Sequence, residues 1–198
     1  MVRIYSTLIE IIAAAVLVIP IMVVYNRIFF RSGKRTVVYI LFGLYCVAIF
    51  ALVGFPNIKS RNIDVSINVI PFIDMASDSV NACLNVLLFV PFGFLLPVLW
   101  SKFRSVKECA MMGCITSCII EISQIFTFRT TDINDLITNT IGTVIGYYIA
   151  KYLTEKFTKY IVSDSKDRDF YIVCISVVVV MFMLQPFISA LLWEMVLR

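Results

Sequence analysis

Polar residues that could bind a ligand gather in residues 121–139, within two apolar stretches of the chain and in the turn that joins them. Glu121 and Gln124 are three residues apart, so they share one face of a helix. If this helix ends near Phe128, Glu121 lies about 10 Å below its end, at a rise of 1.5 Å per residue. A carboxylate at that depth in an apolar medium needs an opposite charge, a proton or an aqueous cleft. Arg129 is the predicted countercharge, because a guanidinium can hold a carboxylate with two hydrogen bonds.

Three further polar residues lie on one face of a second helix that is predicted to begin near Asp132. Asp132, Asp135 and Asn139 are spaced by three and four residues. Asp132 suits a helix N-cap, and carboxylates are favoured near a helix N-terminus. Asn85 opens another apolar stretch from the same side, where its amide could hydrogen-bond to either helix. The predicted ligand-binding residues are therefore Asn85, Glu121, Gln124, Arg129, Asp132, Asp135 and Asn139.

Each of these residues also has a purely structural interpretation. Asp132 would be only a cap, and Glu121 with Arg129 only an ion pair. Asn85 and Asn139 would only join helices to one another. Seven polar groups near one end of a small bundle nevertheless exceed what helix packing requires. The set as a whole therefore favours a shared polar site.

Metal and nucleophilic chemistry find little support in the residue types. The chain has no histidine, which is the commonest general base and metal ligand. Its six cysteines form no CxxC pair or zinc spacing, and we interpret them as packing residues. The oxygens of Asp132 and Asp135, together with those of Glu121 or Asn139, could still hold Mg²⁺ or Ca²⁺. An intramembrane metal-dependent enzyme acting on a lipid-linked phosphate therefore stays the alternative, although no metal, cofactor or catalytic residue is predicted.

The composition places these residues in a membrane protein. Of 198 residues, 61% are hydrophobic and 15% are charged. A soluble domain is roughly half apolar and about a quarter charged. The apolar surplus is too large for one small core, so it must face lipid. A net charge of +4 that is spread over loops does not indicate a nucleic-acid partner.

Six apolar runs are long enough, or nearly so, to cross a hydrocarbon layer that needs about 20 helical residues. They predict an all-α, polytopic membrane helical bundle of about six transmembrane helices, which forms one membrane domain over residues 1–198. The fifth run is short and begins with polar residues, so it is the weakest of the six. The runs are Leu8–Tyr25, Val37–Phe55, Leu84–Trp100, Cys109–Phe128, Leu136–Leu153 and Phe170–Leu192.

The orientation follows from the lysines and arginines between the runs, because such residues favour the cytoplasmic side. Twelve of the 17 follow the first, third and fifth runs, and the other five lie on the opposite side. This distribution predicts a bacterial cytoplasmic-membrane protein that crosses the membrane several times, with both termini outside. The candidate site then faces outward.

Gly142 and Gly146 continue the polar face that Asp132 begins. Glycines four residues apart let another helix approach closely. A homodimer through this face is one prediction from that spacing.

The residues already singled out resemble the motif of the VanZ-like family. Its front half is similar to residues 68–72 and 85–97, which read NVIPF and NVLLFVPFGFLLP. Its back half is similar to Glu121–Gln124, Arg129, Asp132–Asp135, Asn139 and Gly142–Gly146. The resemblance covers a core of about residues 68–148 and keeps the order and spacing of the motif.

This resemblance implies a small, multi-span bacterial membrane protein. The member that gives the family its name confers resistance to the glycopeptide antibiotic teicoplanin, by a mechanism that the family name does not supply. We therefore expect a cell-envelope protein whose outward polar site binds a glycopeptide, a lipid-linked wall precursor or a lipid headgroup. A small transporter or assembly partner is the third hypothesis, although the sequence shows no paired inverted repeats.

Overall fold

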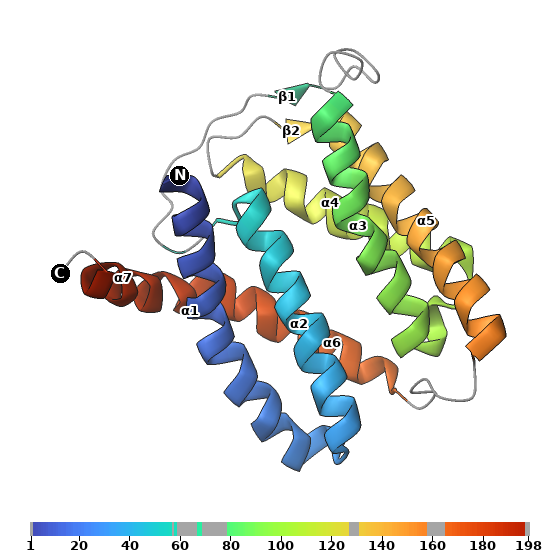
Figure 1. The fold of residues 1–198 in the computed structure, drawn as a ribbon, viewed down its shortest axis with the longest axis horizontal. Coiled ribbons are helices and arrows are strands. Elements are labelled where there is room, and N and C mark those ends of the chain that lie inside the picture. Colours follow the sequence, from blue (N-terminus) through green and yellow to red (C-terminus); the bar gives the residue numbers. More distant parts are fainter. Residues whose placement is uncertain are drawn as a thin grey trace. The chain divides into compact units, whose positions relative to one another are not determined.

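The computed structural model describes residues 2–56, 58, 67–68, 79–126, 131–157 and 165–196. Almost all of the described chain is helical, and the predicted all-α membrane helical bundle is confirmed (Figure 1). By its internal contacts the chain divides into two compact units, Met1–Asn62 with Arg168–Arg198, and Ile63–Asp167.

The first unit holds three long helical stretches. They consist of α1 (Val2–Tyr25), the π-helix η1 (Asn26–Phe30), α2 (Gly33–Val53), α6 (Asp167–Val179), the π-helix η3 (Val180–Leu184) and α7 (Gln185–Val196). α1 packs along α2 and against η3 and α7. A Cβ at Gly43 of α2 would lie in van der Waals contact with the side chains of Val18 from α1 and of Val173 and Val177 from α6, so three helices converge at this small residue.

The second unit places α4 against two helices that run in the same direction (Figure 1). Its elements are β1 (Ile67–Asn68), α3 (Ser79–Leu99), the 3₁₀ helix η2 (Ser101–Phe103), α4 (Val106–Gln124), β2 (Thr131–Asp132) and α5 (Ile133–Phe157). Residues further along α5 contact residues further along α3, so these two helices are parallel. Residues further along α5 contact residues nearer the start of α4, so α4 is antiparallel to both. β1 and β2 form a short parallel pair that aligns Asn68 with Asp132.

Each of the six predicted apolar runs coincides with a helical stretch. Four stretches within the described residues are long and apolar enough to cross a membrane: Tyr5–Phe30, Gly33–Val53, Ser79–Leu99 and Asp167–Met195. α4 and α5 are not among these four, and both carry polar residues of the candidate site together with other polar residues. The sequence therefore concentrates its polar residues on two helices of one unit.

Glycines bring the backbones of α3 and α5 into contact. A Cβ on Gly142 would collide with the Val86 carbonyl oxygen, and one on Gly146 with the Val90 carbonyl oxygen. From the other helix, a Cβ on Gly93 would collide with the backbone of Thr143. The face of α5 that was predicted to contact a second copy therefore contacts α3 of the same chain. The two glycines serve packing within one chain and not the predicted dimer contact.

Two prolines leave backbone carbonyl oxygens without their helical hydrogen bond, and groups elsewhere in the same unit contact these oxygens. A proline in a helix removes the hydrogen bond to the carbonyl four residues earlier. In the first unit, Pro186 frees the carbonyl of Phe182, which accepts a hydrogen bond from the Ile58 N–H at 3.0 Å. In the second unit, Pro97 frees the carbonyl of Gly93, and the Cys109 thiol lies 3.7 Å from that oxygen. Apolar helices cannot leave such oxygens to water, so these contacts stabilise the packing.

Candidate functional site

Glu121 holds the end of α4 to the start of α5. α4 ends at Gln124, so Glu121 lies in its last turn and not about 10 Å below the end, as the sequence predicted. The side chain is 6% exposed, and its Oε2 accepts a hydrogen bond from the Asp132 N–H at 2.9 Å. The Glu121 carbonyl accepts a second bond from the Thr131 hydroxyl at 3.0 Å. β2 therefore lies against the last turn of α4.

Asp132 is an N-cap, as its type and position predicted. Its Oδ1 accepts a hydrogen bond from the Asn134 N–H at 2.9 Å, which satisfies one of the amides at the start of α5. Asp132 therefore receives a bond from its own helix while it gives its backbone N–H to Glu121. These two acidic residues are joined through the backbone and organise the turn.

Asp135 and Asn85 join the first turn of α5 to α3. The Asn85 amide donates to Asp135 Oδ1 at 2.7 Å, a short distance that is typical of a bond to a charged acceptor. Both side chains are only partly buried. Asp135 also lies where the helix dipole favours a negative charge. Asp135 is therefore more accessible than Glu121, which is buried.

Asn139 lies deeper, between α4 and α5. Its amide donates to the Ser117 hydroxyl at 2.9 Å, and its backbone carbonyl accepts from the Thr143 hydroxyl at 2.9 Å. Asn139 is 3% exposed, and no described residue donates to its Oδ1. Gln124 is also buried in α4. A polar layer therefore continues from the half-exposed pair into the bundle.

The structure brings six of the seven predicted residues to one end of the second unit. Three bonds join the helices: one from Asn85 of α3 to Asp135 of α5, one from Asp132 to Glu121 of α4, and one from Asn139 of α5 to Ser117 of α4. Gln124 lies in the same last turn of α4 as Glu121. Arg129, the predicted countercharge of Glu121, lies outside the described residues. The parallel pairing of β1 with β2 also brings Asn68, from the front half of the motif, beside Asp132.

The arrangement gives the metal-enzyme alternative no support. Within the described residues, no group of three or more histidine, cysteine or acidic side chains is placed to share a metal ion. Glu121 Oε2, Asp132 Oδ1 and Asp135 Oδ1 each accept a hydrogen bond from a different protein donor. Binding of hydroxyl and amine groups by half-buried carboxylate and amide side chains suits this geometry better.

Sequence reasoning missed Ser117 and a polar cluster in the first unit. Ser117 precedes Glu121 by four residues and Gln124 by seven, so helical spacing alone could have added it to the site. The cluster joins Tyr39 of α2 to Asp169 of α6, two residues that are 130 positions apart in the chain. No local pattern could have paired them.

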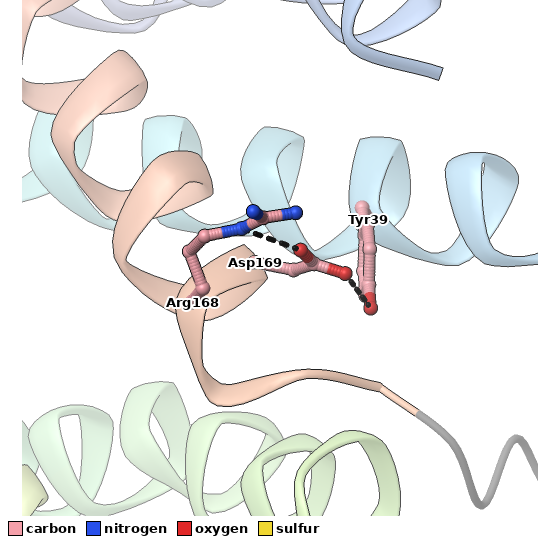
Figure 2. Close-up of polar contacts among 3 residues, drawn as sticks. All are labelled: Tyr39, Arg168 and Asp169. Carbon is pink, nitrogen blue, oxygen red and sulfur yellow. Dashed lines mark hydrogen bonds and ion pairs between the residues drawn. The ribbon is translucent and has the colours of Figure 1, made fainter. Parts of the chain in front are cut away.

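Figure 2 shows how Tyr39 and Arg168 flank the carboxylate of Asp169. The Tyr39 hydroxyl donates to Oδ2 at 3.2 Å, and Arg168 Nε lies 3.9 Å from Oδ1. Asp169 is 1% exposed and Tyr39 is fully buried, whereas more than half of the Arg168 side chain is exposed. The Arg168 guanidinium also lies 5.3 Å from the ring centre of Phe29, within range of a cation–π interaction. The cluster therefore ties α6 to α2 and to η1.

A known protein family matches this chain over the residues of the motif. The model of the VanZ/LLP1 family matches residues 36–154, which is more than half of the chain. The chain belongs to the VanZ/LLP1 family. The match includes the whole predicted core of residues 68–148 and every residue of the candidate site, and it adds most of α2. The VanZ-like resemblance that the motif predicted is confirmed.

A curated VanZ/LLP1 relative is similar over part of its length. Protein VanZ of Enterococcus faecium is 41% identical over 63 residues, which cover 31% of this chain and 38% of that protein. The matching segment thus spans well under half of the relative. No solved structure matches the chain.

Proposed function

We propose that this chain is a bacterial cell-envelope protein that binds its ligand at the outward-facing polar end of α3, α4 and α5. The ligand is a glycopeptide antibiotic, a lipid-linked wall precursor or a lipid headgroup, and binding gives low-level resistance of the teicoplanin type. One observation carries this proposal. The polar residues of the family motif converge on one end of a helical unit, with the partly buried Asp135 beside Asn85.

The chemistry of the site supports a ligand that carries amines and hydroxyls. The described charged residues of the site are Glu121, Asp132 and Asp135, and the predicted Arg129 lies outside the described residues. Carboxylates accept bonds from ammonium and sugar hydroxyl groups, and such bonds are stronger than those between neutral groups. The low dielectric of the surroundings strengthens them further.

The residues of the site differ in how much of the local structure depends on them, and this difference decides which residue to change. Glu121 and Asp132 support the turn, so changing them would disturb structure and binding together. Asp135→Asn removes the charge but keeps an oxygen that can accept the Asn85 amide bond. Loss of one bond from a ligand to a charged group costs about tenfold or more in affinity.

The test is antibiotic susceptibility in a sensitive bacterial host. Cells with wild type, Asp135→Asn, Asn85→Ala or Glu108→Gln at equal membrane levels are challenged with teicoplanin and, in parallel, with vancomycin. Glu108 is a matched control, because it is an acidic residue at the opposite end of α4. We expect teicoplanin protection by wild type and Glu108→Gln, and loss of protection by Asp135→Asn.

Two results would speak against the proposal. Equal protection by Asp135→Asn and wild type would remove the charged group from the binding site. No protection by wild type would show that this family member has another task, and binding of purified lipid-linked precursor would then be measured with the same variants.

A further inference from the structure

The first unit contains a groove that the proposed function does not use. The groove has a volume of about 360 Å³ and lies between α1 and the stretch formed by α6 and η3. Its walls include Pro20, Val24 and Tyr25 on one side, and Ile175, Val179 and Leu184 on the other. An apolar cavity of about 150 Å³ already holds a benzene ring, so this groove has room for a much longer hydrocarbon.

The lining offers little to a polar ligand. Most of the groove is aliphatic, and the Ser176 hydroxyl within it donates to the Ile172 carbonyl of its own helix at 2.6 Å. Val24 and Val179, on opposite walls, are 53% and 42% exposed, so the groove opens to the surroundings of the unit. Both walls belong to stretches that are apolar enough to cross a membrane. The surroundings of the groove are therefore acyl chains.

The longer wall of the groove matches one leaflet of a bilayer. From Ile175 to Leu184 this wall advances roughly 14 Å, at 1.5 Å per residue, whereas the α1 wall advances roughly 8 Å from Pro20 to Tyr25. The hydrocarbon core is about 30 Å thick, so the longer wall covers about half of it. One acyl chain of one leaflet fits such a length.

Positive charge lies beyond one end of the groove. Tyr25 is followed directly by η1, which carries Arg27, and then by Arg31 and Lys34, and all three of these basic residues are exposed. Arg168 lies at the start of α6, and its guanidinium rests on η1 through the Phe29 ring. An anionic headgroup at this end would meet several cations, and each such cation favours an anionic lipid.

We propose that the groove binds one acyl chain of an anionic phospholipid, with its headgroup on the basic residues of η1 and the α1–α2 connection. The lipid fills the space between α1 and α6 and occupies a site separate from the polar end of α3, α4 and α5. Phosphatidylglycerol is the probe, and phosphatidylcholine is the zwitterionic comparison with the same acyl chains.

The test is native mass spectrometry of the purified full chain, with each lipid added to delipidated protein. Val24→Trp fills the groove, and Val23→Trp is its control, because Val23 is a neighbouring residue of similar exposure, 48%, that is outside the lining. Val179→Trp and Val178→Trp repeat the comparison on the other wall, which guards against failure of one variant to fold. Arg27→Gln tests the headgroup contact without touching the groove.

We expect wild type and both control variants to retain one phosphatidylglycerol in preference to phosphatidylcholine. Val24→Trp and Val179→Trp should lose it. Arg27→Gln should lower the preference for phosphatidylglycerol about fivefold, since one basic residue near the surface is worth about 1 kcal/mol.

Three results would overturn the proposal. The first is equal retention by the groove-filling variants and their controls. The second is equal retention of both lipids by wild type. The third is no retained lipid at any ratio, which would show that the groove binds neither lipid. None of these results bears on teicoplanin protection, so the two proposals fail independently.

Discussion

The close approach of α3 and α5 predicts that Gly146→Ala strongly destabilises the chain. A Cβ at Gly146 would lie 2.7 Å from the Phe94 amide nitrogen and closer still to the Val90 carbonyl oxygen. Both neighbours are backbone atoms of α3, so no side-chain rotation can make room. The two helices must move apart, which weakens every contact between them.

The magnitude follows from two opposing effects. Alanine is favoured over glycine in a helix by about 1 kcal/mol. Overpacking of a well-packed interior costs typically 1–3 kcal/mol, and sometimes more. Because the obstruction is backbone, the upper end applies, and we expect a net loss of about 2 kcal/mol in the free energy of unfolding.

Two other glycines supply controls with the same chemical change. A Cβ on Gly33 meets no atom within 4 Å, and one on Gly43 meets the Val18 side chain at an ordinary 3.4 Å. Gly33→Ala should be neutral or stabilising, and Gly43→Ala should be close to neutral. Unfolding of the purified chain in mixed micelles would measure all three. If Gly146→Ala were as stable as Gly33→Ala, the inferred backbone contact between α3 and α5 would be wrong.

Three further predictions concern buried bonds and orientation. Tyr39→Phe should lower the free energy of unfolding by about 1.5–3 kcal/mol, because it removes a hydrogen bond to the Asp169 carboxylate. Tyr148→Phe, which changes an exposed ring, is the control and should leave stability unchanged. Equal effects of the two substitutions would refute the bond. Ser117→Ala should cost about 1–3 kcal/mol in the same assay, because it leaves a buried amide without its acceptor, and an unchanged stability would contradict that pairing. An impermeant maleimide should label exposed Cys83 in intact cells, with Cys83→Ser as the blank. Labelling only after permeabilisation would reverse the predicted orientation of α3.

Local pattern was sufficient to predict the helices and the cap. Runs of apolar residues identify helices without knowledge of their partners, because burial in lipid depends on composition and length. Asp132 could be predicted as an N-cap because capping involves residues only two or three positions away. The six described site residues could be placed at one end of a unit because consecutive membrane spans alternate in direction, so the end of one run lies on the same side as the start of the next.

The contacts that define the packing could not be predicted from the same patterns. The spacing of Gly142 and Gly146 predicted a close helix contact but could not tell α3 from a second copy, since either partner satisfies the pattern. The depth of Glu121 was wrong because the end of α4 depends on the return of β2, which is a tertiary contact. Tyr39 and Asp169 are far apart in sequence, so only the fold pairs them.

The glycine contacts and the Asn85–Asp135 pair of the polar site lie on the same two helices, α3 and α5. Gly142 and Gly146 hold α5 against α3 at backbone distance, and the Asn85–Asp135 bond joins the same two helices nearer their start. If this pair binds the ligand as proposed, rigid elements reduce the entropy that is lost on binding, so the affinity depends on that rigidity. Gly146→Ala should therefore reduce protection against teicoplanin even where the protein is still present in the membrane, although it changes no residue of the polar site. A site formed by side chains on independently moving helices would not transmit such an effect.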